Sequence, residues 1–313
     1  MRLTLLGPVY PYRGGIAHYT AMLSQACLRR GHELQVASFR RQYPAFLYPG
    51  ATDKDPSQDP LKVQAEYLLD PLLPWTWLAA ARSIQRFAPR LVVAMWWTTF
   101  WALPYTVAGA LLRRGGAPLV YLVHNVLPHE QRPWDLPLAR LAFHTASAFI
   151  VQAEHEQRRL AALLPGARVA LCPHPVYTFA GHGFPDHRLE RASARQRLAL
   201  PPDRPVLLFF GIVRRYKGLD ILLEALGALR QEGISPILLV CGEIWEDKAA
   251  YLQKIHALGL DENVRLDDRY IPNEEIAPLF SAADLLVVPY TAGTQSGAAN
   301  LALGFGLPMV ITE

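Results

Sequence analysis

Short apolar runs recur along this chain of 313 residues, separated by stretches long enough to form helices. Most runs are apolar at every position, which is typical of strands buried on both faces. Strands of this kind, joined by helices, build parallel sheets. The runs expected as strands in the first half are 3–6, 34–38, 91–96, 119–123, 148–152 and 169–172. Those expected in the second half are 206–210, 237–241, 264–266, 285–288 and 309–312.

Two of the intervening stretches have a clear helical period. Residues 16–27 place their apolar side chains on one face, and Gly31 follows as a C-terminal glycine would. Leucines repeat in the same way from residue 219 to residue 229. Each helix follows a strand that ends in glycine, Gly7 in one case and Gly211 in the other. The sequence therefore predicts two doubly wound, Rossmann-like α/β domains with similar openings.

The expected boundary lies in a segment rich in proline, glycine and charge, residues 174–205. We place it near residue 185, which gives an N-terminal domain of residues 1–185 and a C-terminal domain of residues 186–313. A second irregular segment, residues 43–60, is proline-rich and long for a connection inside a domain. We expect it to be either disordered or a functional loop.

Charge is distributed unevenly between the two predicted domains. Residues 1–185 contain 18 Lys and Arg against 10 Asp and Glu, whereas the remainder contains 13 against 17. A basic half is compatible with scattered solvated arginines, an anionic membrane surface or an acidic substrate. Nucleic acid is not expected as a partner, because no recognition motif accompanies the basic residues.

Cysteine content and the N-terminal sequence bear on the cellular compartment. The three cysteines are far apart and lack metal-site spacing, which indicates neither a disulfide framework nor a zinc cluster. The first ten residues contain too short an apolar run for a signal peptide or a membrane span. We therefore expect a cytoplasmic protein.

Two stretches combine glycine with a helix start, an arrangement that favours binding of an anion. The first is "GPVYPYRGGIAHYT", where Gly14 and Gly15 precede a predicted helix. The second is "FFGIVRRYKGLD", where Arg214, Arg215 and Lys217 precede another. Three cations beside a helix N-terminus suit a diphosphate, and Lys217 is the preferred single candidate.

A third loop, in "VVPYTAGTQSGAANLAL", also places small residues just before a predicted helix. Backbone amides near Gly297 and the Ser296 hydroxyl are candidates to hold a further phosphate oxygen. Close packing of helix on strand is the alternative explanation of this loop.

The motifs "YPYRGGIAHYT", "LVHNVLPHE", "FGIVRRYKGLDILLEAL", "ADLLVVPY" and "QSGAANLALGFGLPMVI" occur in this order along nearly the whole chain. In that order and spacing the sequence resembles the retaining glycosyltransferases of family four, which have the two-domain GT-B fold. The resemblance implies an N-terminal domain that receives the acceptor and a C-terminal domain that binds a nucleotide-diphosphate sugar. It further implies chemistry in a cleft between them, with no cofactor and no required metal.

The resemblance also implies roles for individual residues. Gly14 and Gly15 correspond to the glycine loop that touches the donor diphosphate, which Lys217 and either Arg214 or Arg215 hold from the other side.

A histidine of "LVHNVLPHE" corresponds to one beside the donor sugar, and we prefer His124 to His129. His18 is a candidate for a phosphate or the acceptor, with a solvated position on the helix face as the alternative. Trp96 and Trp97 are candidates to stack on a sugar or lipid, although core packing is the preferred interpretation.

Three departures from the family pattern stand out. The last motif commonly contains two glutamates eight positions apart, and here Gly293 and Leu301 occupy those places. Ile212 stands where an arginine often follows the glycine. The chain ends just after the strand that usually precedes another strand–helix unit, so we expect the second domain to be incomplete.

The main hypothesis is a retaining glycosyltransferase that acts in cell-envelope polysaccharide or glycolipid synthesis. Its expected acceptor is a sugar or a lipid-linked sugar, and we expect attachment at the inner face of an anionic membrane. The alternative is a non-catalytic nucleotide-sugar-binding subunit of the same fold, which the missing glutamates favour. A nicotinamide dehydrogenase is disfavoured because no G-x-G-x-x-G motif follows Leu6.

Overall fold

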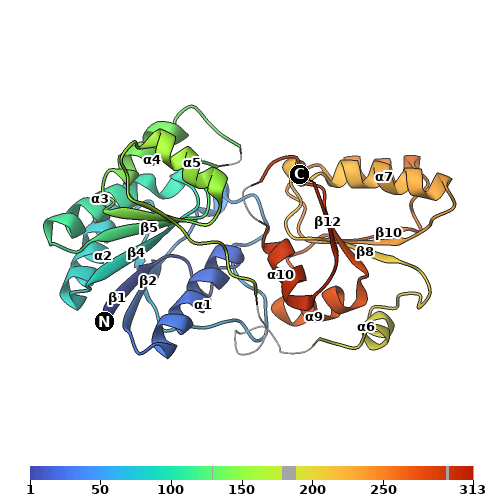
Figure 1. Cartoon of the computed structure of the whole chain (residues 1–313), viewed down its shortest axis with the longest axis horizontal. Helices are drawn as coiled ribbons and strands as arrows, with labels where there is room; N and C mark the ends of the chain where they lie inside the picture. The colour runs from blue at the N-terminus through green and yellow to red at the C-terminus, as the bar shows by residue number, and fades with distance from the viewer. Residues whose placement is uncertain (129, 178–187, 294–295, 313) are drawn as a thin grey trace. The chain divides into compact units, whose positions relative to one another are not determined.

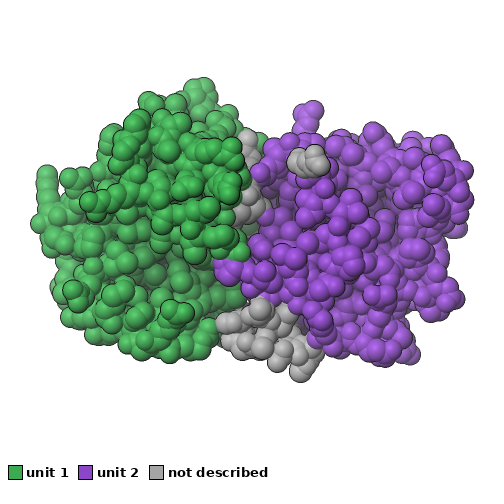
Figure 2. Space-filling view, in the orientation of Figure 1, with its two compact units in different colours: residues 1–55, 61–174 green, residues 56–60, 175–313 purple. Residues whose placement is uncertain are grey.

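The computed structural model describes residues 1–128, 130–177, 188–293 and 296–312. It contains two compact units (Figure 2). The first unit comprises residues 1–55 and 61–174, and the second comprises residues 56–60 and 175–313. The boundary predicted near residue 185 falls in 178–187, outside the described residues.

The first unit is built on a seven-stranded sheet with the order β3-β2-β1-β4-β5-β6-β7. Every neighbouring pair of strands is parallel. The strands are β1 (Arg2–Leu6), β2 (Glu33–Phe39), β3 (Glu66–Leu69), β4 (Leu91–Trp96), β5 (Leu119–Val123), β6 (Ala148–Val151) and β7 (Val169–Leu171). The chain adds strands in one direction from β1 and in the other from β4. Ligands of open α/β sheets bind at such a switch point.

Helices cover both faces of this sheet (Figure 1). They are α1 (Gly15–Arg29), α2 (Pro74–Phe87), α3 (Ala102–Arg114), α4 (Asp135–Phe143) and α5 (Glu154–Leu163). Alternate strand residues point to opposite faces. Leu5 and Met95 pack with Tyr19 of α1, whereas Leu6 and Trp96 pack in the larger cluster that includes residues of α2, α3 and α4.

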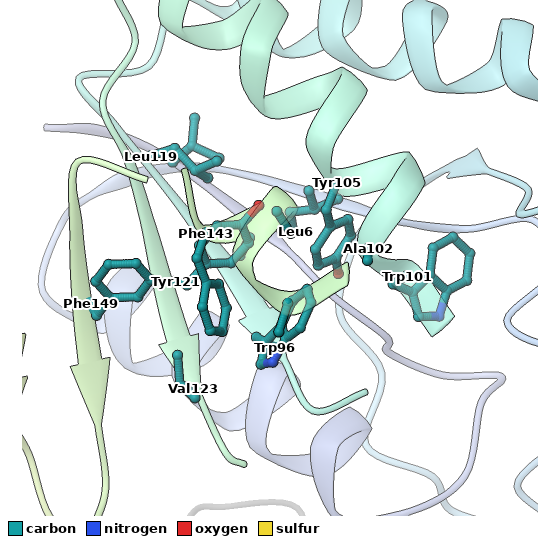
Figure 3. Close-up of a cluster of buried hydrophobic side chains, with 14 of the residues drawn as sticks. Leu6, Trp96, Trp101, Ala102, Tyr105, Leu119, Tyr121, Val123, Phe143 and Phe149 are labelled. Carbon is teal, nitrogen blue, oxygen red and sulfur yellow. The ribbon is translucent and has the colours of Figure 1, made fainter. Parts of the chain in front are cut away.

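Aromatic rings fill the larger core of the first unit (Figure 3). The Trp96 ring lies 4.6 Å from that of Phe143 and 5.8 Å from that of Tyr121, measured between centroids. Its indole N–H donates to the carbonyl of Val126 at 3.2 Å. Trp96 is only 1% exposed, so core packing is the correct interpretation of this residue. Trp97 is partly buried and donates to the Tyr43 hydroxyl at 2.8 Å.

The second unit has a five-stranded parallel sheet with the order β10-β9-β8-β11-β12. Its strands are β8 (Val206–Phe210), β9 (Ile237–Cys241), β10 (Val264–Asp267), β11 (Leu285–Val288) and β12 (Met309–Ile311). Its helices are α6 (Arg191–Arg197), α7 (Leu219–Gln231), α8 (Lys248–Ala257), α9 (Asn273–Ala282) and α10 (Gly297–Phe305). The direction of strand addition changes between β8 and β11. Each unit therefore has one switch point, as a doubly wound sheet requires.

The predicted strands are all present, with ends within one residue of those expected. The strand that the sequence analysis missed is β3, a four-residue strand at the sheet edge that begins with Glu66 and Tyr67. The irregular segment that precedes it is ordered in part, since Tyr12 forms a bridge with Lys54. Asn273 N–H donates to the Ser57 hydroxyl at 3.0 Å, and both residues belong to the second unit.

Replacing Trp96 by alanine should destabilise the first unit by about 3–5 kcal/mol, because a large buried ring leaves a cavity that the sheet cannot close. Trp134 is the matched control, since it is 54% exposed. Its replacement by alanine should change stability by less than about 0.5 kcal/mol. Urea unfolding followed by near-ultraviolet circular dichroism measures both. Equal effects of the two substitutions would contradict this description of the core.

Candidate functional site

The glycine turn of the first unit joins β1 to α1 at the switch point. Gly7 leaves the sheet where a Cβ atom would lie 2.6 Å from Cγ of Met95, so the chain has no room for a side chain there. Gly14 has a φ of +104°, a value that favours glycine, and it precedes α1 without any side-chain cap. Gly15 is exposed, and a Cβ atom there would meet nothing within 4 Å. The helix thus presents its N-terminal main chain at the edge where a ligand is expected.

His124 follows β5, on the same edge of the sheet as the glycine turn. Its backbone N–H donates to the carbonyl of Trp96 at 2.8 Å, which fixes the residue against β4. The imidazole is buried and stands perpendicular to the Tyr19 ring at 5.0 Å between centroids. Tyr19 in turn lies 5.2 Å from the His174 ring. An aromatic residue of α1 therefore links two histidines that follow different strands.

Burial lowers the pKa of His124 to about 3. The charge of nearby His174 lowers the pKa further, and interaction with the Gln152 side chain acts in the opposite direction. The imidazole is consequently neutral at physiological pH. A neutral imidazole donates or accepts a hydrogen bond without placing a full charge beside a sugar.

The other two predicted histidines do not join this cluster in the described residues. His18 Nε2 lies 3.5 Å from Oδ2 of Asp55, and both side chains are largely buried. This contact ties α1 to the segment after β2, so a structural role accounts for His18, although a role toward a ligand stays a prediction. His129 lies outside the described residues.

Lys217 lies at the switch point of the second unit, in the short 3-10 helix Arg215–Lys217 that follows β8. Its ammonium stands close to Gly211, where a Cβ atom would lie 3.0 Å from Nζ. The same nitrogen lies 5.4 Å from the ring centroid of Tyr290, which follows β11. Burial lowers the pKa of Lys217, and the nearby charge of Arg214 lowers it further. Among the described residues, no carboxylate pairs with this ammonium.

Gly218 holds the Lys217 turn against the end of β11. Its φ is +68°, and a Cβ atom would lie 2.0 Å from the carbonyl oxygen of Pro289. A second contact joins the same loops, because Thr291 N–H donates to the carbonyl of Tyr216 at 2.8 Å. The loops after β8 and β11 are therefore one packed unit, and α7 begins at its centre.

Ser296 caps α10, accepting a hydrogen bond from Ala299 N–H at 3.2 Å. Its hydroxyl also donates to the Tyr290 hydroxyl at 3.4 Å, so Tyr290 contacts both Ser296 and Lys217. Gly297 is the first residue of α10, and a Cβ atom there would meet nothing within 4 Å. Residues 294 and 295 of this loop lie outside the described residues.

The two arginines of the turn have different surroundings. The Arg214 guanidinium lies over the Trp245 ring at 5.7 Å, and Trp245 donates to Glu243 at 2.9 Å. Arg215 is exposed. Arg214 is close enough to Lys217 for their charges to oppose each other, so these two cations share one region of the second unit.

Sequence reasoning missed residues whose importance comes from packing. Tyr290, Tyr19 and Gln152 are partly or fully buried beside the predicted residues. Gln152 comes directly after β6 and Tyr290 comes two residues after β11, and this position at a strand end was a usable signal in the sequence. Leu301, at the place of an expected glutamate, is 6% exposed and packs inside the unit. That Gly14 and Lys217 meet at one diphosphate stays a prediction.

Two parallel, Rossmann-like α/β units of this kind define the GT-B class of fold. The model of Glycosyltransferase Family 4 matches residues 13–178, more than half of the chain, and the model of Glycosyl transferases group 1 matches residues 204–313. The chain belongs to Glycosyltransferase Family 4.

Individual relatives agree with this membership. The chain is 34% identical over 227 residues to D-inositol 3-phosphate glycosyltransferase 1 of Catenulispora acidiphila, covering 64% of this chain and 52% of that protein. It is 28% identical over 203 residues to the GDP-mannose:glycolipid 4-beta-D-mannosyltransferase of Xanthomonas campestris, covering 64% and 51%. The chain spans about half the length of these curated relatives.

Solved structures share the fold at low sequence identity. Sucrose-phosphate synthase from Thermosynechococcus elongatus superimposes with a TM-score of 0.70 at 16% identity, covering 99% of this chain and 80% of that one. Anabaena HepE in complex with UDP-glucose gives 0.69 at 20% identity, with the same coverage. Within the described residues, none of the helices has the length and apolar character needed to cross a bilayer.

The buried His124 should make stability depend on pH. Its pKa is held near 3 in the folded chain, against 6.5 for an ordinary histidine, so the unfolded chain binds more protons between these values. The stability gained by burying a neutral His124 is fully present above about pH 6.5 and is lost as the pH falls toward 3. His124→Gln should therefore remove a slope of about 1.4 kcal/mol per pH unit in this range.

The exposed histidine His256 offers a matched control, since His256→Gln removes an imidazole that is not buried. Unfolding free energies from urea titrations at a series of pH values measure both variants against the parent. An unchanged slope for His124→Gln would show that the imidazole is not held neutral by burial.

Proposed function

We propose that this protein is a retaining glycosyltransferase that moves a sugar from a nucleotide-diphosphate donor to an acceptor. In this proposal Lys217 and Arg214 bind the donor diphosphate in the second unit, with Ser296, Gly297 and exposed Arg215 as further contacts. Gly14 and Gly15 contribute main-chain amides from the first unit. The reaction uses no cofactor and no metal ion.

The observation that carries the proposal is the partly buried ammonium of Lys217 with no carboxylate partner among the described residues. Burial of a cation without a counter-charge is unfavourable, and a bound anion relieves it. The start of α7 follows directly after Lys217, and α10 begins at the neighbouring loop, so two helix N-termini add positive potential. A diphosphate of charge near −2 or −3 satisfies all of these groups.

The chemistry follows from where charge develops. Breaking the bond between the anomeric carbon and the diphosphate leaves negative charge on the leaving group and positive character on the sugar. Fixed cations and amides stabilise that leaving group as its charge grows. His124, neutral and rigidly held, is proposed to hydrogen-bond the donor sugar, because retention in this family is thought not to need a protein nucleophile.

The relatives named above support a donor and acceptor class. The structure of Anabaena HepE is that of a complex with UDP-glucose, and the Xanthomonas campestris relative is a GDP-mannose:glycolipid mannosyltransferase. We propose for this chain a nucleotide-sugar donor and a sugar or lipid-linked acceptor of cell-envelope polysaccharide or glycolipid synthesis. The reaction takes place in the cytoplasm at the inner face of the membrane.

A second candidate is a nucleotide-sugar-binding subunit without turnover. The positions of Gly293 and Leu301 favour it, since neither offers a carboxylate to the donor ribose or sugar. Incubation with radiolabelled nucleotide sugars separates the two candidates. Release of labelled sugar or its transfer supports the enzyme, whereas binding without release across donors and acceptors supports the subunit.

Lys217→Ala should lower turnover by about a hundred- to a thousand-fold, the usual effect of losing one fixed donor to a developing anion. Binding of nucleoside diphosphate, measured by calorimetry, should weaken in parallel. Lys254→Ala is the control, because Lys254 pairs with Glu224 on the surface of the same unit. A folded Lys217→Ala protein with full turnover would refute the diphosphate assignment.

A further inference from the structure

Large apolar side chains are exposed at one edge of the first unit. We call the group formed by Phe46, Trp75, Leu103 and Trp134 the aromatic rim; these side chains are 79%, 63%, 52% and 54% exposed. Each belongs to a segment that directly follows a different strand. The segments are the loop after β2 and the starts of α2, α3 and α4. Chains leave parallel strands at the carboxyl edge of the sheet, so all four segments lie on that edge.

Side-chain contacts join these segments into one continuous surface. Trp97, after β4, donates to the Tyr43 hydroxyl in the loop after β2. Arg41 of that loop pairs with Asp70, after β3, at 3.3 Å. Thr99, before α3, hydrogen-bonds to Asp135 at the start of α4. The segments that carry the aromatic rim are therefore held together by polar contacts, while the rim side chains themselves are exposed.

Exposed basic side chains outnumber exposed carboxylates on this edge. Arg40, Arg41 and Arg132 are exposed, and the Arg132 guanidinium lies 5.6 Å from the centre of the Trp134 ring. The carboxylates of Asp70 and Asp135 are buried and used within the unit, Asp53 pairs with Lys54, and Glu130 and Glu154 are exposed. Exposed tryptophans on a surface that also exposes arginines match the interfacial region of an anionic bilayer, where indole rings sit at headgroup level.

We propose that the aromatic rim binds the surface of an anionic lipid bilayer. Resting on the proposed function, this assigns a lipid-linked acceptor, since the same sheet edge carries the Gly14–Gly15 turn and His124. A polyprenyl- or acyl-linked sugar held in the headgroup layer then reaches the acceptor side of the site without leaving the bilayer. A lipid bilayer can bury the apolar side chains of this surface and attract its arginines through lipid phosphates at the same time. A sugar dissolved in water cannot do both.

Flotation with vesicles tests the surface. The wild-type chain should bind phosphatidylcholine vesicles that contain phosphatidylglycerol, and binding should weaken without the anionic lipid and at high salt. The paired variant Leu103→Ser with Leu136→Ser should lower affinity by about ten-fold, because apolar surface is lost from the interface. Leu136 lies in the first turn of α4, two residues after Trp134 in the chain, and is 39% exposed.

A matched pair controls for loss of apolar surface in general. Leu28 and Leu141 are 53% and 44% exposed but lie in the last turns of α1 and α4, at the other edge. Leu28→Ser with Leu141→Ser should keep wild-type affinity. Arg40→Gln should weaken binding more than Arg114→Gln, which changes the last turn of α3. Circular dichroism confirms that each variant is folded.

Vesicle binding needs neither donor nor turnover, so the flotation result does not depend on whether the protein transfers a sugar. Lys217→Ala should float with vesicles as the wild type does. Equal losses for the two leucine pairs, or no binding to anionic vesicles, would overturn the surface even if sugar transfer were observed. Disruption of a dimer by Leu103→Ser with Leu136→Ser, without vesicle binding, would assign the surface to a second copy of the chain instead.

Discussion

Parallel pairing of strands is the constraint on which both units depend. A parallel pair needs a crossover helix, and that helix starts at the carboxyl edge of the sheet. Where the order of strands reverses, two neighbouring strands send their chains in opposite directions and leave an opening between them. The openings lie between β1 and β4 and between β8 and β11. Gly14, His124 and Lys217 are near these openings because of topology, before any specific contact is formed.

Within the second unit, position alone would not hold a cation in place. Lys217 is partly buried because Gly218 allows the chain to approach Pro289 to a distance that any side chain would prevent. That approach brings Tyr290 next to the ammonium, and Ser296 donates a hydrogen bond to the Tyr290 hydroxyl. The unfavourable desolvation of Lys217 is thus built into the turn, and it is the ground on which we propose an anionic ligand there.

Prediction from sequence succeeded where period and composition determine the structure. The central strands are apolar at nearly every position, so their ends were predicted within one residue. β3 was missed because an edge strand has one neighbour and tolerates Glu66 and Tyr67 at exposed positions.

Side-chain environments were harder to predict. The burial of His124 depends on Tyr19 and His174, which are about 105 and 50 residues away in the chain, so no local pattern encodes its lowered pKa. The partners of His18 and Lys217 are likewise set by loops that pack only in the folded chain. The sequence predicted which residues are near the openings but not what surrounds them.

Tryptophan illustrates the same limit and bears on how the basic charge is used. Trp96, the last residue of β4, is buried in the core, whereas Trp75 and Trp134, in the connections after β3 and β5, are exposed. Many arginines of the first unit, including Arg29, Arg86 and Arg113, lie in the last turns of helices, where they interact with the negative end of the helix dipole. Helix termini therefore account for much of the positive charge of this half. Arg40 and Arg132 are not explained in this way, because they lie in loops at the opposite edge, where the Arg132 guanidinium lies over the exposed Trp134 ring.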